Sequence, residues 1–414
     1  MSAVKTTLKR LSKSAQRQAN LGVVTKVLRL RVKDKHALFF QSQAKDVNMV
    51  WNYCQELSLR VLAREQRFMS AFDMARYTKG ATQEGLQLHS QTVQAISEEY
   101  CTRRKQFKKA KLRWRASFGK RKALGWIPVK ACALSYRNGQ VHYQGKAISL
   151  WDSFGLKDYA LRQGNFCEDA RGRWYLNVTV DVKKPAASLG TSAVGIDLGL
   201  KDFACTSDGA KVAAQKIYRG AQYDLAVAQR SRNKERVRAI HAKIANRRKD
   251  FLHKLSTDLV KTHGAIFVGN VNAAKLAKTK MAKSVLDAGW SSFRTMLKYK
   301  CDHAAVWFEE VNERYSSQDC GVCHARTGPK GLSGLAVREW TCSVCQTVHD
   351  RDTNAAKIIL ARGLAQMRIT TAVEARARET AVNEVAQEQS LRGSDPRAGV
   401  GHDPLEAGIP SQVA

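Results

Sequence analysis

Two aspartates in this sequence have the surroundings of metal-binding carboxylates. Asp197 ends the apolar run AVGID and precedes Gly199, where the backbone is expected to turn, and Asp352 opens the helical pattern TNAAKIILARGL. Carboxylates at neighbouring strand ends can hold two divalent cations, one activating the attacking water and the other stabilising the leaving oxygen. Mg²⁺ favours such oxygen ligands. The pair indicates a metal-dependent nuclease site of the RNase H-like class.

Each aspartate also has a simpler interpretation. Asp197 could be an ordinary turn residue at a strand end, and Asp202 in the following turn is a weaker alternative candidate. Asp352 could cap the helix that follows it, since Asp is favoured at helix N-termini. Asp350 could supply that cap instead, and Asn354 could add a polar ligand or orient Asp352.

The middle member of such a site is missing from its usual place. The strand-like run 265–270, AIFVGN, ends in Gly269 and Asn270, which provide no carboxylate. The next apolar run, AVWFEEVNERYSSQ, carries Glu313, 44 residues after Gly269. Neighbouring strands lie about 4.8 Å apart, so a glutamate on one can reach a site on the other when both end at the same edge. Glu313 is therefore a candidate for the missing carboxylate.

Two other glutamates on the same run are rivals for this role. Strand alternation puts Glu309 on the same face as Glu313 and Glu310 on the opposite face. Roughly 13 Å of strand separates Glu309 from Glu313, so both cannot reach one pair of metals. Glu313 lies nearest the end of the run, where Asp197 is also expected. The alternative interpretation is a surface glutamate beside an inactive site.

Four of the ten cysteines are spaced as metal ligands. Cys320 and Cys323 form one Cys-x-x-Cys pair, Cys342 and Cys345 form another, and eighteen residues separate the two pairs. Four thiolates at this spacing predict a structural zinc ribbon with no coordination position left for catalysis. Glycine usually follows the second cysteine of each pair, but His324 and Gln346 stand there, and His324 could compete as a ligand.

The composition points to a nucleic-acid partner. The 414 residues carry a formal net charge of +34, and the sequence pI is about 10.0. A soluble protein this basic repels itself unless a polyanion is present. The sequence has no apolar run of eighteen residues or more and no signal-peptide core, which predicts no membrane partner. We expect a cytoplasmic, nucleoid-associated protein in a prokaryote, or a nuclear one in a eukaryote.

The order of patterns along the chain predicts a β-barrel interrupted by helices and then an α/β domain. Alternation in Lys26–Lys33 and Arg173–Val182 indicates strands, and Asn138-Gly139 is a hairpin signature. The long segment between them has helical spacing of apolar positions. The predicted divisions are a basic tail 1–21, a barrel 22–43 and 118–184 with a helical insertion 44–117, a linker 185–192, an α/β domain 193–318 and 349–371, a zinc ribbon 319–348, and a partly disordered tail 372–414.

Four blocks of the sequence resemble TnpB proteins, which insertion sequences encode and which are regarded as ancestors of the type V CRISPR effectors. These blocks are GIDLGLKDFACTSDG, IANRRKDFLHKLST, RYSSQDCGVC and HDRDTNAAKIILARGL. The resemblance covers roughly residues 20–370. It implies a wedge β-barrel with a helical recognition insertion, followed by a RuvC-like domain of RNase H type with a zinc ribbon insert.

The resemblance also implies an RNA-guided DNA endonuclease. Its partners would be a guide RNA from the transposon end and a double-stranded DNA target next to a short motif, with base pairing supplying sequence specificity. Two basic runs are the expected nucleic-acid contacts, the first of them around Phe107. The residues concerned are Arg103, Arg104, Lys108, Lys109, Lys111, Arg247, Arg248, Lys249 and Lys254.

The resemblance bears directly on the missing carboxylate. The usual family pattern has Glu where this chain has Gly269, but a subset of TnpB proteins and the eukaryotic Fanzors resemble this chain in carrying a glutamate about this far downstream. We therefore expect Asp197, Glu313 and Asp352 to hold two Mg²⁺ ions. The alternatives are a nuclease-dead RNA-guided DNA-binding protein and an RNA-binding protein of the translation machinery.

Overall fold

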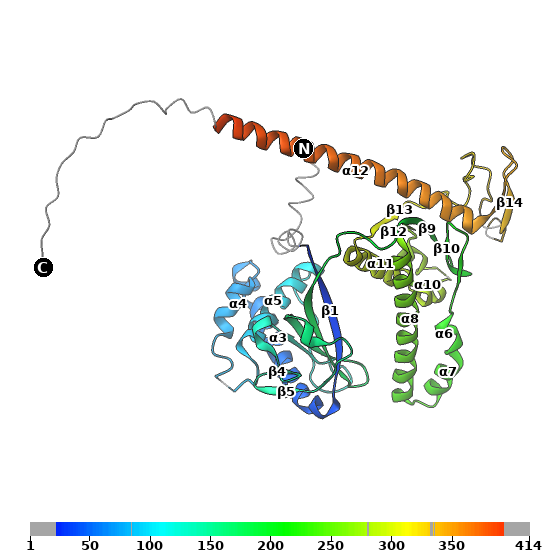
Figure 1. The fold of residues 1–414 in the computed structure, drawn as a ribbon. Coiled ribbons are helices and arrows are strands. Elements are labelled where there is room, and N and C mark those ends of the chain that lie inside the picture. Colours follow the sequence, from blue (N-terminus) through cyan, green and yellow to red (C-terminus); the bar gives the residue numbers. More distant parts are fainter. Residues whose placement is uncertain (1–21, 84, 280, 332–333, 335, 393–414) are drawn as a thin grey trace, which may run out of the picture.

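The computed structural model describes residues 22–392 except 84, 280, 332–333 and 335, with side chains described up to residue 372 except that of Lys275. The predicted basic tail 1–21 and the end of the chain from 393 lie outside the described residues. The chain forms two units side by side, and one long helix runs past both (Figure 1). No helix in the described part of the chain has the length and apolar character needed to cross a membrane.

The first unit contains two antiparallel sheets and a group of helices around one apolar core. Asn138 and Gly139 have φ of +48° and +74°, which is the left-handed turn that the Asn-Gly pair predicted. The larger sheet has the order β2-β7-β8-β1-β6 and the smaller one the order β3-β4-β5. The strands are β1 (Val23–Val32), β2 (Trp126–Val129), β3 (Leu134–Arg137), β4 (Gln140–Tyr143), β5 (Lys146–Ile148), β6 (Leu150–Trp151), β7 (Leu161–Glu168) and β8 (Trp174–Lys183).

The three described α-helices of this unit lie between β1 and β2 in the sequence. They are α3 (Ala37–Glu65), α4 (Ala71–Thr78) and α5 (Ser90–Phe107). Helix α3 begins at Ala37, seven residues before the predicted start at Ala44. Phe40 explains the difference, because its ring is fully buried against Phe166 and Trp174 of the sheet and anchors the first turn of the helix.

Arg104 on α5 is a core residue, which corrects its prediction as a nucleic-acid contact. Its side chain is buried, and its guanidinium donates hydrogen bonds of 2.7 Å to Ser58 Oγ on α3 and 2.7 Å to the Met69 carbonyl. The guanidinium also lies 4.4 Å from the ring centre of Phe68. Arg104 therefore joins α5 to α3 and to the segment before α4.

Replacing Arg104 with Ala should lower the free energy of unfolding by about 2–4 kcal/mol, because two buried acceptors lose their donor. Arg103 is the matched control: it is exposed, pairs with Glu99 one turn earlier at 2.6 Å and donates to the Gln106 side chain at 3.0 Å. Arg103→Ala should cost less than about 1 kcal/mol. Urea unfolding of both variants checks this difference, and equal effects would contradict the buried role of Arg104.

The second unit is built on a five-stranded sheet with the order β11-β10-β9-β12-β13. Strands β9, β10 and β11 are antiparallel, whereas β12 runs parallel to both β9 and β13. This is the RNase H-like arrangement that the resemblance to TnpB proteins implied. The strands are β9 (Ser192–Leu198), β10 (Asp202–Thr206), β11 (Lys211–Ala213), β12 (His263–Gly269) and β13 (Trp307–Val311).

Helices cover both faces of this sheet. Helices α8 (Lys234–Thr262) and α11 (Trp290–Ala304) pack on the face that carries Ile266 and Val268. Helix α12 (Arg351–Arg392) packs on the opposite face, where Phe267, Val311 and Ile359 meet. A Cβ atom at Gly195 would lie 2.2 Å from the Ala356 carbonyl oxygen, so glycine allows α12 to approach β9.

The remaining elements of the second unit are short. They are α6 (Ile217–Gly220), α7 (Gln222–Arg230), α9 (Ala273–Leu276), α10 (Ala282–Ala288), β14 (Glu339–Thr341) and β15 (Val348–Asp350), with short 3-10 turns at Asp34–His36, Ala131–Ala133 and Leu156–Asp158 in the first unit. Strands β14 and β15 pair in the region predicted as a zinc ribbon, 319–348, which is called the cysteine module below, and β15 leads directly into α12. Helix α12 continues to Arg392, so the first part of the predicted tail 372–414 is helical.

Candidate functional site

Strand register brings Asp197, Gly269 and Val311 level at the C-terminal ends of β9, β12 and β13 in the five-stranded sheet. Ile196 pairs with Val268 across β9 and β12, and Gly269 pairs with Val311 across β12 and β13. Asp197 therefore lies level with Gly269, and alternation directs both positions toward the face covered by α12. Glu313 follows Val311 by two residues, just past the end of β13.

Glu313 occupies the space that a side chain at position 269 would fill. A Cβ atom built on Gly269 would lie 2.5 Å from Glu313 Oε2 and 3.3 Å from Glu313 Cβ. The Glu313 backbone N–H donates to Asn270 Oδ1 at 3.3 Å. Asn270 thus holds the turn that carries Glu313, and the carboxylate of Glu313 lies over the end of β12.

Replacing Gly269 with Ala should lower cleavage about 10–100-fold, because the added methyl group displaces the Glu313 carboxylate and small misplacements of catalytic groups are costly. The stability change should be small, since Glu313 Oε2 is the far end of a flexible side chain. In a Glu313→Ala background the same substitution should have no further effect on cleavage. Single-turnover cleavage of a matched duplex measures both changes, and a further loss in that background would contradict this explanation.

Asp352 lies in the first turn of α12, on the face that packs against the sheet. Arg338 Nη1 lies 3.1 Å from Asp352 Oδ2. The helix cap is Asp350, whose Oδ1 accepts from the Thr353 backbone N–H at 2.9 Å. Although partial burial opposes the change, hydrogen bonds from Lys211 and Thr353 lower the pKa of Asp350 to about 2. Because Asp350 supplies the cap, Asp352 is available for another role.

The three predicted carboxylates act on one another electrostatically. Burial raises the pKa of Asp197 to about 7, with further increases from the charges of Glu313 and Asp352, while Arg351 opposes the shift. Burial also raises the pKa of Glu313, and Arg294 opposes that shift. Negative charge is therefore under-compensated at this edge, which is the situation that bound cations relieve.

The rival acidic residues are engaged elsewhere. Glu310 lies 3.2 Å from Arg294, and Glu309 accepts from the Trp307 ring nitrogen at 3.4 Å. Asp202 lies at the start of β10, across from Ala213 on β11. The strand register and the effect of the Glu313 and Asp352 charges on Asp197 indicate that these three carboxylates lie at the same end of the sheet. Among the described residues, their oxygen atoms do not form a group of three close enough to hold one metal ion.

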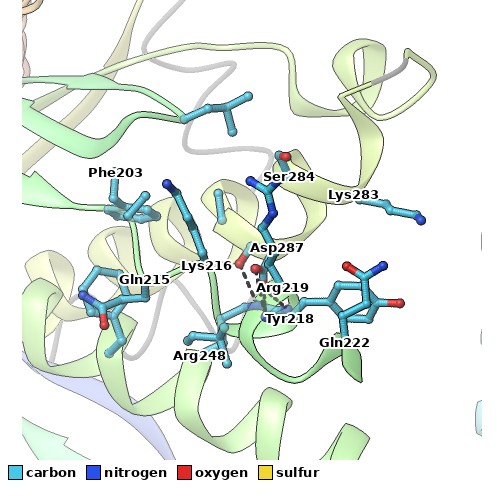
Figure 2. A pocket seen from close by; sticks show the side chains of 15 residues that line it. Phe203, Gln215, Lys216, Tyr218, Arg219, Gln222, Arg248, Lys283, Ser284 and Asp287 are labelled. Atoms are coloured by element: carbon cyan, nitrogen blue, oxygen red, sulfur yellow. Dashed lines mark hydrogen bonds and ion pairs between the residues drawn. The ribbon is translucent and has the colours of Figure 1, made fainter. Parts of the chain in front are cut away.

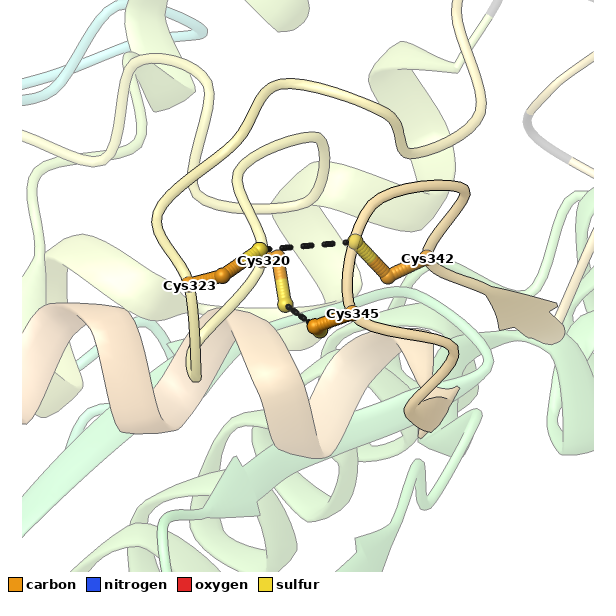
Figure 3. A group of neighbouring side chains, drawn as sticks. All are labelled: Cys320, Cys323, Cys342 and Cys345. Carbon is orange, nitrogen blue, oxygen red and sulfur yellow. Dashed lines mark hydrogen bonds between the residues drawn. The ribbon is translucent and has the colours of Figure 1, made fainter.

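The four cysteines form a compact cluster, and two loops supply them (Figure 3). Their sulfur atoms all lie within 4.8 Å of one another, and among the described residues no other group of three or more His, Cys, Asp or Glu ligand atoms is as compact. The Cys320–Cys345 and Cys323–Cys342 sulfur distances are both 3.5 Å. A zinc ion 2.3 Å from each sulfur would place the sulfurs about 3.8 Å apart, so the cluster fits a zinc ribbon.

Two features of the cluster differ from expectation. His324 and Gln346 have φ of +62° and +59°, so they take the left-handed conformation that glycine usually provides in such turns. His324 is not part of the sulfur cluster. The histidine next to a ligand is instead His349, whose Nε2 lies 3.0 Å from Cys320 Sγ and whose ring packs on Trp340. Nothing in the cysteine spacing indicated His349.

Asn354 ties the cysteine module to α12. Its Oδ1 accepts from the Gly321 backbone N–H at 2.9 Å, and its Nδ2 donates to the Asp319 carbonyl at 2.8 Å. The side chain is buried and fully engaged, so it serves as a structural link and not as a ligand beside Asp352. Arg338 in the module and Asp352 on the helix provide a second link.

The basic residues expected to contact nucleic acid fall into separate groups. Lys109, Lys111 and Arg103 line a hollow of about 700 Å³ next to the exposed rings of Phe107 and Trp114. Lys108 is the exposed residue at the end of α5. On α8, Arg247 and Lys254 line a groove, Lys249 is exposed outside it, and Arg248 is paired with Asp287 at 2.8 Å. Arg248 therefore has a structural partner.

Comparisons with known proteins agree with this arrangement. Residues 176–280 match the family model described as "Probable transposase", and residues 290–359 match the Cas12f1-like TNB domain. A "Putative RNA-guided DNA endonuclease" of Streptomyces pristinaespiralis is 36% identical over 254 residues, covering 56% of this chain and 61% of that protein. A protein of the same description from Escherichia coli (strain K12) is 28% identical over 225 residues, covering 46% of this chain and 54% of that protein.

The fold has a solved counterpart. The cryo-EM structure of a Cas12f1–sgRNA–target DNA complex superposes with a TM-score of 0.54 at 13% identity, covering 82% of this chain and 99% of that chain. The matches to the two curated relatives above span 61% and 54% of those proteins' lengths. The transposase and TNB matches and the relatives described as RNA-guided DNA endonucleases agree with the resemblance to TnpB proteins.

Proposed function

We propose that this protein is an RNA-guided DNA endonuclease. It would hydrolyse phosphodiester bonds of the target DNA in an active site formed by Asp197, Glu313 and Asp352. The observation that carries the proposal is the position of Glu313, which lies 2.5 Å from where a Cβ atom of residue 269 would be. A carboxylate from the turn after β13 thus lies at the end of β12, where Gly269 provides none. The relatives described as RNA-guided DNA endonucleases support the same activity.

The carboxylates would hold two Mg²⁺ ions. When bound, such ions activate the attacking water and stabilise the leaving oxygen in an in-line displacement. The chain's own residues orient the carboxylates: Asn270 holds the turn of Glu313, and Arg338 holds Asp352. The products would be a 5′-phosphate and a 3′-hydroxyl. The four cysteines would hold a structural zinc ion.

The partners would be a guide RNA derived from the transposon end and a double-stranded DNA target. Charge supports the nucleic-acid partners, since the chain carries a formal net charge of +34. Phosphate contacts on this scale would make binding strongly salt-dependent.

The proposal is tested by incubating the protein–RNA complex with plasmids that carry a matched or mismatched target beside a randomised flanking sequence. We expect Mg²⁺-dependent cutting of the matched target next to one short motif. The missing carboxylate at Gly269 favours a second candidate, an RNA-guided DNA-binding protein without cleavage. Binding of the matched duplex with no cutting in Mg²⁺ would favour that candidate.

A further inference from the structure

A pocket in the second unit lies apart from the three carboxylates. It has a volume of about 320 Å³ and is formed by the start of α6 together with α8, α10 and the turn after β9 (Figure 2). The turn contributes Leu200, three residues after Asp197. Pockets that hold small ligands have volumes of about 300–1,000 Å³, so this one is large enough for a single small group.

The walls of the pocket are held in place by Asp287. Its two carboxylate oxygens accept from the Tyr218 backbone N–H at 3.0 and 2.9 Å, as the dashed lines in Figure 2 mark. Arg248 on α8 donates through Nη2 to Asp287 Oδ1 and through Nε to the Asp287 carbonyl, both at 2.8 Å. Asp287 therefore joins α6, α8 and α10, and its charge is neutralised by Arg248.

The lining combines aromatic rings with unpaired cations. Phe203 and Phe251 lie edge to face at 5.2 Å and form part of the apolar wall. Lys216, Arg219 and Lys283 are exposed around the pocket, and among the described residues none of the three forms an ion pair. An apolar aromatic wall beside free positive charge suits a ligand with a flat ring and phosphate groups.

A basic groove continues from the pocket along α8. The groove has a volume of about 740 Å³ and shares Lys216 and Phe251 with the pocket. Arg236, Lys243 and Arg247 lie on its α8 side and recur at helical spacing. Asp224 and Asp250 also line the groove, and Lys254 pairs with Asp250 at 2.9 Å. The three cations span residues 236 to 247, about 17 Å of helix, and cations spaced along a groove favour an extended polyanion over an isolated small anion.

We propose that the pocket takes one unstacked nucleotide of a single-stranded nucleic acid. Its base would pack against the half-buried ring of Phe251, which the buried Phe203 supports from behind, and its phosphates would contact Lys216, Arg219 and Lys283. The strand on one side of this nucleotide would follow the α8 groove. A base-paired duplex would not fill the pocket, because a nucleotide must leave its stack before its base can enter a pocket of this size. The inference rests on the proposed function only in taking a nucleic acid as the ligand.

Filling the pocket tests this inference. Ser284 is an exposed lining residue on α10, so Ser284→Trp would put a ring where the base is expected. The matched control is Ser292→Trp, which adds the same ring at an exposed position on α11 outside the pocket. The probes are a labelled 20-nucleotide single strand of mixed sequence, as DNA and as RNA, and a duplex of the same sequence, titrated with full-length protein.

Ser284→Trp should weaken single-strand binding roughly 5- to 100-fold, the range expected for losing one stacked base. Its duplex affinity should stay within twofold of wild type, and Ser292→Trp should bind both probes normally. A larger loss with RNA would identify the guide as the source of the nucleotide, and a larger loss with DNA would identify a target strand. Single-strand affinity unchanged in Ser284→Trp, or reduced equally in both tryptophan variants, would overturn the inference.

A charge variant keeps the inference testable if Ser284→Trp does not fold. Arg219→Gln/Lys283→Gln removes two of the proposed phosphate contacts, so the slope of log affinity against log salt for single strands should fall by about 1.4. An unchanged slope would overturn the inference. These assays measure binding and not cleavage, so wild-type protein that binds single strands but does not cut would contradict the nuclease proposal alone.

Discussion

The Glu313→Gln variant should cleave a matched duplex roughly 10³-fold more slowly than wild type, or not measurably. The amide has almost the shape of the carboxylate, so the packing around Gly269 and the hydrogen bond to Asn270 should survive. What is lost is one negative charge and one strong oxygen ligand for Mg²⁺. Binding of the guide RNA and the target DNA should therefore stay within about twofold of wild type, since the change is confined to the site.

Glu310→Gln is the matched control for this experiment. Glu310 lies three residues earlier, is partly exposed and pairs with Arg294 at 3.2 Å. Because its side chain points to the other face of the sheet, its loss should change cleavage less than about threefold, as for most changes away from a site. Single-turnover cleavage at saturating guide RNA measures both variants. Rapid cutting by Glu313→Gln would contradict the assignment of Glu313.

Loss of the zinc site should have the second-largest effect. We expect Cys342→Ser to reduce cleavage about 100-fold or more, because structural zinc sites contribute directly to folding. Asn354 binds the backbone of Gly321 at 2.9 Å, and Arg338 holds Asp352 at 3.1 Å, so an unfolded cysteine module would release the first turn of α12. The loss of activity would then come from misplacement of Asp352 and not from the zinc ion itself.

A zinc-selective chelator in excess Mg²⁺ should reproduce this loss, and added Zn²⁺ should restore activity. The control variant is Cys132→Ser, since Cys132 is exposed in the first unit and far along the chain from the cluster. It should cleave like wild type and keep its sensitivity to the chelator. Full activity in Cys342→Ser, with one zinc ion fewer per molecule by elemental analysis, would show that the module does not position Asp352.

Much of the second unit could be predicted because its sequence signals are local. Asp197 and Gly269 each end a short apolar run, and such runs predicted an α/β domain, whereas the resemblance to TnpB proteins implied its RNase H-like sheet. The face of Glu313 followed from alternation, although β13 ends at Val311 and Glu313 lies in the turn beyond it. The assignment of Glu313 as a metal ligand remains a prediction.

What the sequence could not reveal depends on contacts between distant segments. Arg103 and Arg104 are adjacent and equally basic, yet only Arg104 faces the core, where Ser58 and Met69 accept its hydrogen bonds. Helix α3 starts early because Phe40 finds aromatic partners more than a hundred residues away. Such partners become visible only after the chain has folded.

The pocket beside α10 also could not be predicted, because it depends on contacts between segments that are distant in the sequence. It depends on the bond between Asp287 and the backbone of Tyr218, 69 residues apart in the sequence. Arg248 was expected to contact nucleic acid because it lies in a basic run, but its guanidinium is taken by Asp287. The basic run therefore contains one residue that builds the pocket and others, such as Arg247, that line the neighbouring groove.

The central claim, that Glu313 serves in place of a carboxylate at position 269, is tested most directly by a double-mutant cycle in single-turnover cleavage. The four proteins are wild type, Gly269→Glu, Glu313→Ala and Gly269→Glu/Glu313→Ala. We predict that both single variants are slow, Gly269→Glu because two glutamates compete for one space and Glu313→Ala because the carboxylate is gone. The double variant should be at least about tenfold faster than either, a coupling expected only for residues that share a site. A double variant slower than both single variants, with their losses simply combined, would contradict the claim.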